Sequence, residues 1–358
     1  MQIGMGFAKL FQVAQEYEIT DKLGKIIEKR ANATHKPYKT MKTIFKGFIQ
    51  NARIYHFNLK KAKANISTYY RDLRRCNKDS YKMAKNILEK LYLKAKRKRS
   101  INITIDGTFI GVRGEKYEGA TKMYSGNKKD RGKEGYTIVT CFDSTNKMPI
   151  TFETTNIHEI HAFETLIERA IEMEKEGEII INKIVLDALY FNKKIIDMLS
   201  LHKFIIRTPS YEWLLEKINK EVKRGCKEIE LWGNKVTLYW KKSKDKKKKK
   251  GNKYDLLITN APDKRIWWVY GHYKQMIENY HNDLKNKFGI RRLPSQKLYA
   301  ILVYFAMIIV IYAIARAILL GLDLNYLSCG SVITVAYNSN SINSFIENLF
   351  KLHKKKRR

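Results

Sequence analysis

One uncharged segment near the C-terminus constrains the fold more than any other part of the chain. It runs from Leu298 to Ala315 and contains 18 residues without a charge, bracketed by Lys297 and Arg316. A helix of that length can span a bilayer, but the same pattern describes a helix that is buried on all sides of a large α/β core. A lone span near the end of so basic a chain would be unusual, so we expect a core helix and no membrane.

The charge balance indicates which partner the protein binds. Lys and Arg total 70 against 35 acidic residues, which gives a formal charge of +35. Such an imbalance usually accompanies a polyanionic partner, either nucleic acid or an anionic membrane surface. A compositional bias toward lysine usually brings glutamate with it, and glutamate does not keep pace here. We therefore expect double-stranded DNA as the partner.

The cysteines and the N-terminus indicate the compartment. The chain has four cysteines, which lie far apart without a C-x-x-C pair, so neither a zinc ribbon nor a disulfide framework is indicated. The first residues lack the basic start, apolar run and cleavage site of a signal peptide. We expect a cytoplasmic, nucleoid-associated protein.

The middle of the chain alternates between strand and helix patterns. Its order of elements is β-β-β-α-β-α-β, which is the order of the ribonuclease H-like fold. In that fold the first and fourth strands lie side by side. The expected strands are 101–106, 136–143, 148–156, 179–187 and 203–209, and the expected helices are 158–175 and 191–199.

The first and fourth of these strands are expected to end in an aspartate, Asp106 and Asp187. A carboxylate at the end of a buried strand is tolerated where it caps a turn or binds a cation. Asp106 is followed by a glycine, so a turn explains it when the residue is taken alone. If the two strands are neighbours, however, the two carboxylates lie close together, and like charges at that distance need a divalent cation between them.

A later amphipathic helix, expected over 265–292, supplies a third acid. Lys274, Glu278 and Lys285 are separated by 4 and 7 residues, so they share one helical face. Tyr270 and Tyr273 lie on the same segment. By contrast, the His-Glu-Ile-His stretch at 158–161 does not have the H-E-x-x-H spacing of a zinc site, and we interpret it as a helix start.

These residues resemble the DDE transposases of bacterial and archaeal insertion sequences, in the branch marked by a Y-(2)-R-(3)-E-(6)-K signature. Glu278 and Lys285 match E-(6)-K, and Lys274 stands at the arginine position. The tyrosine position is taken by Gly271, so the flanking tyrosines match only loosely. The resemblance covers roughly residues 100 to 320.

The resemblance implies a site and a chemistry. Asp106, Asp187 and Glu278 would be the catalytic acids and would hold two Mg²⁺ or Mn²⁺ ions for DNA cleavage and strand transfer without a covalent protein intermediate. Hard cations suit carboxylate oxygens. The residues expected to bind DNA in this part of the chain are Lys274, Lys285, Tyr270 and Tyr273.

The chain divides into five expected parts. The first is an all-α DNA-binding domain that contains a helix-turn-helix candidate with outward-facing Arg71 and Arg74, although an ordinary basic helix has the same pattern. It ends in the basic linker 94–99. The parts are the helical domain 1–98, the first part of the ribonuclease H-like core 99–209, a β-rich insertion 210–264 with strands at 228–240 and 254–262 around a lysine-rich loop, the C-terminal core helices 265–325, and a basic tail 326–358.

Other functions remain open from the sequence. A nuclease or resolvase could use the same fold without joining DNA, and an inactive element could leave a DNA-binding or membrane-associated remnant. Chemistry at two element ends calls for two active sites, so we expect a homodimer that forms on DNA.

Overall fold

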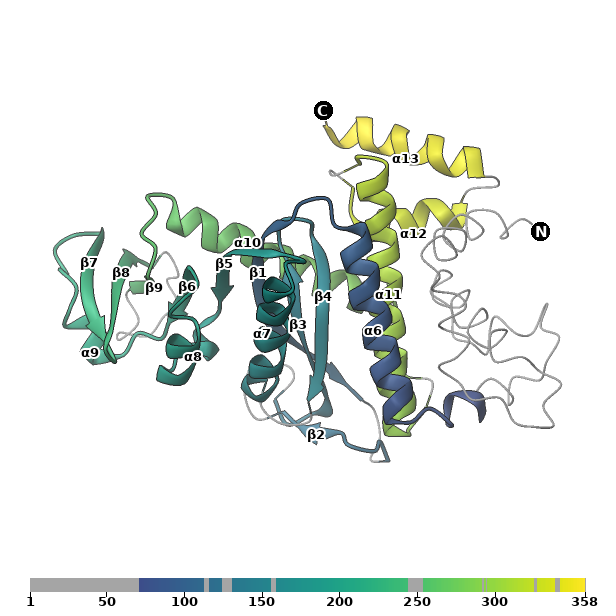
Figure 1. The fold of residues 1–358 in the computed structure, drawn as a ribbon, viewed down its shortest axis with the longest axis horizontal. Coiled ribbons are helices and arrows are strands. Elements are labelled where there is room, and N and C mark those ends of the chain that lie inside the picture. Colours follow the sequence, from purple (N-terminus) through teal and green to yellow (C-terminus); the bar gives the residue numbers. More distant parts are fainter. Residues whose placement is uncertain are drawn as a thin grey trace.

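The computed structural model describes residues 71–112, 116–123, 131–155, 159–243, 254–291, 293, 295–324, 327–338 and 342–357. These residues form a mixed α/β fold around one large sheet (Figure 1). The strands are β1 (Ser100–Gly111), β2 (Thr121–Lys122), β3 (Glu134–Asp143), β4 (Met148–Thr155), β5 (Ile180–Leu186), β6 (Phe204–Thr208), β7 (Arg224–Leu231), β8 (Asn234–Lys242) and β9 (Tyr254–Thr259). The helices are α6 (Lys78–Ala95), α7 (Ile160–Lys175), the 3₁₀ turn η1 (Ala188–Tyr190), α8 (Lys193–Met198), α9 (Glu212–Leu215), α10 (Ile266–Asn286), α11 (Leu298–Gly321), α12 (Cys329–Asn338) and α13 (Ile342–Arg357).

The sheet is mixed, with the order β2-β3-β1-β5-β6-β9-β8-β7 and with β4 paired to β3. β1, β3 and β4 form the expected antiparallel meander. β5 runs parallel to β1, which confirms that the first and fourth expected strands are neighbours. β6 continues the sheet in parallel on the other side of β5.

β1 is longer than the sequence indicates. We expected the strand to end at Asp106, but it continues to Gly111, and its pairing with β3 continues to Gly135. The expectation was wrong because Asp-Gly has the pattern of a turn, whereas ladder bonds to β3 keep this backbone extended. β5 stops earlier: its pairing with β1 ends at Ile105 and Leu186. Asp106 therefore lies within β1, just past the point where β5 stops covering it.

The β-rich segment extends the same sheet. β9 pairs antiparallel with β6, β8 with β9, and β7 with β8. The stretch 228–240, which we expected to be one strand, is broken by a tight turn in which Trp232 and Gly233 have positive φ values of 50° and 83°. Two successive positive φ values are those of a type I′ hairpin turn, which suits the twist of the flanking strands. The lysine-rich loop lies largely outside the described residues.

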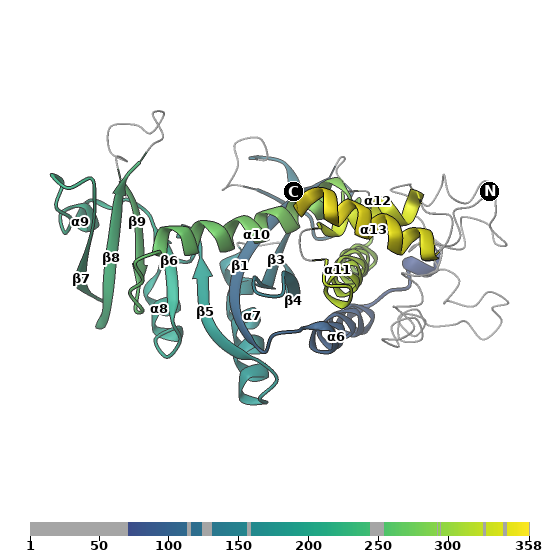
Figure 2. The same ribbon diagram turned by 90° about the horizontal axis from the view of Figure 1, so that it is seen from above.

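The uncharged C-terminal segment is the core helix α11, as expected. Each of its residues from Ala300 to Leu320 is buried. It packs against α6 and β4 (Figures 1 and 2). Among the described residues it is the one helix whose length and composition would suit a membrane span, and 89% of that window is buried inside the fold. This helix therefore forms the interior beside the sheet.

Helices cover both faces of the sheet. Figure 2 shows α7 and α8 on one face and α10 crossing the strands on the other. α10 contacts β1 and β5, while α7 contacts β4, β3 and β5. The part of the sheet formed by β1 and β5 therefore lies beneath α10.

Only the end of the expected DNA-binding domain can be described. The start of the helix-turn-helix candidate lies outside the described residues, while Arg71 and Arg74 are both exposed. α6 packs into the same core as α11 and β4, with Leu88, Leu91 and Tyr92 almost fully buried. The division at residue 98 stays a prediction.

Candidate active site

Two carboxylates and one ammonium meet at the edge where β5 ends. Lys274 Nζ lies 2.7 Å from Asp106 Oδ1 and 3.1 Å from Asp187 Oδ2. Asp106 comes from β1, and Asp187 follows β5 directly and caps η1, where its Oδ1 accepts a hydrogen bond from the Ala188 N–H. The structure thus brings the two predicted aspartates together. We call Asp106 and Asp187 the carboxylate pair.

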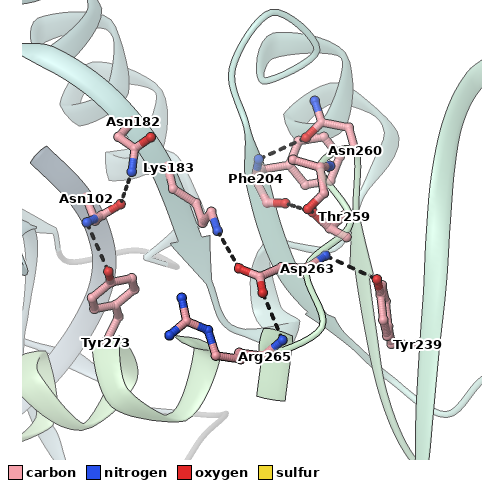
Figure 3. Close-up of polar contacts among 11 residues, drawn as sticks. Asn102, Asn182, Lys183, Phe204, Tyr239, Thr259, Asn260, Asp263, Arg265 and Tyr273 are labelled. Atoms are coloured by element: carbon pink, nitrogen blue, oxygen red, sulfur yellow. Dashed lines mark hydrogen bonds and ion pairs between the residues drawn. The ribbon is translucent and has the colours of Figure 1, made fainter. Parts of the chain in front are cut away.

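Polar contacts tie α10 and the residues just before it to β1 and β5 (Figure 3). The Tyr273 hydroxyl accepts a hydrogen bond of 3.0 Å from Asn102 of β1, and the Asn102 side-chain oxygen accepts another from Asn182 of β5. Just before α10, Asp263 lies 3.4 Å from Lys183 of β5 and accepts a bond from the backbone N–H of Arg265. These contacts set the rotation of α10 that turns Lys274 toward the sheet.

Burial and neighbouring charges act in opposite directions on the ionisation of Asp106, Asp187 and Lys274. Burial raises the pKa of Asp106 despite the opposing charge of Lys274. Burial also acts on Asp187, but Lys274 and the Ala188 N–H outweigh it and leave the pKa of Asp187 below its ordinary value. For Lys274 burial disfavours the charge, yet the two aspartates outweigh burial and raise its pKa. The ammonium is therefore held charged between two carboxylates.

The other predicted residues of α10 lie nearby with different contacts. The Tyr270 hydroxyl donates to Asp187 Oδ1 at 3.4 Å. Glu278 lies one turn beyond Lys274, and its surface is largely exposed. Partial desolvation raises its pKa, with Lys274 opposing the rise and the carboxylate pair adding to it. Lys285 is partly buried and acts electrostatically on His281. The roles of Glu278, Lys285, Tyr270 and Tyr273 stay predictions. The Tyr273 hydroxyl binds Asn102 of β1 and so links α10 to the sheet.

Sequence reasoning missed two groups at the site. His281 Nδ1 lies 3.7 Å from Asp106 Oδ2, and burial holds the pKa of His281 well below its usual range. Its position seven residues after Lys274, on the same helical face, was a signal that could have identified it. The second group is Glu159, at the N-cap of α7, where the structure confirms the expected helix start. Burial and Asp106 raise the pKa of Glu159 to about 7.

The donor set suits a hard divalent cation. Carboxylate oxygens of Asp106 and Asp187 already converge on one positive atom, and such oxygens are the ligands that Mg²⁺ and Mn²⁺ prefer. Across the described ranges, however, no three His, Cys, Asp or Glu side chains are grouped closely enough to hold a metal ion. The structure thus joins the first two predicted acids and leaves Glu278 within electrostatic range of them.

The fold and the site define a class of protein: an α/β protein with a carboxylate pair at the point where one of two neighbouring parallel strands ends. Residues 97–314 match the family described as the transposase DDE domain, and the chain belongs to that family. The fold is similar to that of a piggyBac transposase in a synaptic complex with hairpin DNA, determined by cryo-EM. The TM-score is 0.57 at 11% sequence identity, over 96% of this chain and 82% of that one, so the likeness is one of fold. The chain matches none of the curated proteins with which it was compared.

Proposed function

We propose that this protein is a DDE-type DNA transposase that cuts and joins the ends of an insertion element by two-metal-ion phosphoryl transfer. The observation that carries the proposal is the convergence of Asp106 and Asp187 on one cationic atom, Lys274 Nζ, at the point where β5 ends beside its parallel neighbour β1. The family match and the likeness of fold support it. The strand order around β1 and β5 also supports a ribonuclease H-like core.

The residues have distinct parts in that chemistry. Asp106, Asp187 and Glu278 would hold two Mg²⁺ or Mn²⁺ ions, which supply activation of the attacking oxygen and stabilisation of the leaving oxygen. The carboxylates would fix the position of that charge. Lys274 and Lys285 would bind phosphates of the element end as point charges.

The proposal includes the branch with the Y-(2)-R-(3)-E-(6)-K signature. Lys274 stands at the arginine position of that pattern, and its contact with both aspartates supports a role at the site. Tyr270, one residue before the tyrosine position, also reaches Asp187. These two contacts support the assignment to that branch.

The test is a reaction on labelled duplexes that carry the element's terminal repeats, with Mg²⁺ or Mn²⁺ as the added cation. A transposase should release the end and also join its 3′-hydroxyl to a second duplex. Cleavage without any joined product would support the rival metal-dependent nuclease or resolvase. Binding without cleavage in either metal would identify an inactive remnant and contradict the proposal.

We expect Arg71 and Arg74 to contribute to binding of the element end. Each phosphate contact that is lost makes the negative slope of log affinity against log salt shallower by about 0.9 in duplex DNA. Replacing both arginines by Ala should therefore reduce the magnitude of this slope by about 2. Fluorescence anisotropy of the full-length protein at several salt concentrations measures this slope. The matched control replaces Lys82 and Lys90, two exposed lysines of α6, by Ala. An unchanged slope in the arginine variant, or an equal change in the lysine control, would show that Arg71 and Arg74 do not bind the element end specifically.

We further propose a homodimer on paired ends. Free protein with a formal charge of +35 repels its own copy over the screening length of about 8 Å at physiological salt, and DNA removes that repulsion. Light scattering should therefore show monomers alone and two chains per complex with end duplexes. A stable dimer without DNA, or a monomer at saturating DNA, contradicts this expectation.

A further inference from the structure

Gly107 makes room for an acid from another part of the chain. Its φ lies outside the left-handed region, so the backbone of β1 does not require a glycine there. A Cβ at this position would overlap with the carboxylate of Glu159. Gly107 and Glu159 therefore fit together as a pair: the missing side chain leaves the space that the carboxylate occupies.

Glu159 reaches the site from the face opposite α10. Successive residues of a strand point to opposite faces, so the open side of Gly107 faces α7 while Asp106 faces Lys274. Pairing of β1 with β5 ends at Ile105, so no β5 residue covers β1 at Asp106 and Gly107. Through this gap Glu159 interacts electrostatically with Asp106 most strongly, and then with Lys274 and Asp187.

A second, independent feature indicates that a ligand is bound here. The side chain of Tyr190 is fully buried, and its hydroxyl has no hydrogen-bond partner among the described residues. The groups that act on this hydroxyl are Glu159, Asp106 and Asp187. A buried hydroxyl without a partner is costly, so one within electrostatic range of three carboxylates points to a polar species bound among them.

We propose that Glu159 is a fourth acidic residue of the cation-binding site, which increases the affinity of the carboxylate pair for divalent cations. The inference rests on the proposed function, since it concerns the same cations. Glu159 stands outside the pair and acts on it from a short distance at low solvent exposure, where a negative charge attracts a cation strongly. Groups that support metal ligands in this way typically change affinity by about 10- to 100-fold.

The experiment is a calorimetric titration of the DNA-free full-length protein with Mn²⁺ alone. Glu159→Gln removes the charge at almost constant shape and should weaken Mn²⁺ binding by about tenfold or more. The matched control is Glu168→Gln, the same chemical change at an exposed position on α7, and it should bind as the unchanged protein does. Gly107→Ala should reproduce the loss, because its methyl group displaces the Glu159 carboxylate.

The remaining variants separate the possible outcomes. Glu159→Asp keeps the charge and should bind Mn²⁺ more tightly than Glu159→Gln, which a packing role alone would not produce. Equal affinity of the Glu159→Gln and Glu168→Gln variants, with both folded by thermal melting, overturns the inference. Asp106→Asn tests the proposed function separately, because unchanged Mn²⁺ binding in that variant would show that the carboxylate pair is not the metal site at all.

Discussion

Replacing Asp106 by Asn should lower the rate of end cleavage by about 10³-fold or more while leaving the affinity for end DNA nearly unchanged. Metal ions at a phosphoryl-transfer site supply several kcal/mol of transition-state stabilisation, which corresponds to a loss of this size. Asn keeps the shape of Asp106 but not its charge, so β1 should stay intact. DNA binding rests on lysines and arginines elsewhere on a strongly basic chain.

Single-turnover cleavage and fluorescence anisotropy measure the two quantities on the same substrate. Asp187→Asn and Glu278→Gln should behave like Asp106→Asn. Asp197→Asn is the control, since Asp197 is exposed on α8 and contacts Asn234 rather than the pair. Near-normal cleavage by any one of the three active-site variants in Mg²⁺ would show that its residue is not a catalytic acid.

Replacing Asp143 by Ala should lower the free energy of unfolding by about 3 kcal/mol. Asp143 is fully buried at the end of β3, and its carboxylate accepts bonds from the Tyr92 hydroxyl of α6 at 3.0 Å and the Thr145 N–H at 2.7 Å. Asn146 donates two more, from its backbone N–H and its side-chain amide. Ala leaves several of these buried donors without a partner, at a cost of about 1–3 kcal/mol for each unsatisfied group.

Urea unfolding curves provide the measurement. Tyr92→Phe removes one of the four donor groups and leaves no buried donor without a partner. It should therefore lower the free energy of unfolding by only about 1 kcal/mol. Asp197→Ala, which removes an exposed carboxylate with one bond to Asn234, should change stability by less than about 1 kcal/mol. If Asp143→Ala costs no more than the Tyr92 variant, the Thr145 and Asn146 donors do not depend on this carboxylate, and the expected size of the loss is wrong.

The parts of the site that follow periodic rules could be predicted from the sequence. The alternation of strand and helix patterns predicted that Asp106 and Asp187 lie on neighbouring strands. The helical repeat predicted that Lys274 and Glu278 share one face of a helix. The parallel neighbours β1 and β5 then brought the two aspartates together, as the order of elements implied. Local patterns were sufficient here because each residue is placed by the element in which it lies.

Glu159 could not be predicted in that way. Its position depends on a gap beside β1 that exists only because β5 stops at Leu186, and on a glycine whose open side faces α7. The dipeptide Asp106-Gly107 instead indicated a turn, because local preference says nothing about a side chain from a distant helix. The same limit applies to the Trp232-Gly233 turn, which divides a stretch that has the pattern of one strand.

The packing of α6 has a consequence for where the enzyme would cut. The segment between α6 and β1 is short and is held by hydrogen bonds. The backbone N–H groups of Arg97 and Lys98 both donate to the Asn146 side-chain oxygen at 3.1 Å, and β1 begins at Ser100. The 18-residue helix α6 is about 27 Å long. If Arg71 and Arg74 contact the element end as proposed, the length of α6 fixes the distance between these arginines and the active site. That distance then sets the number of base pairs between the recognised sequence and the cut.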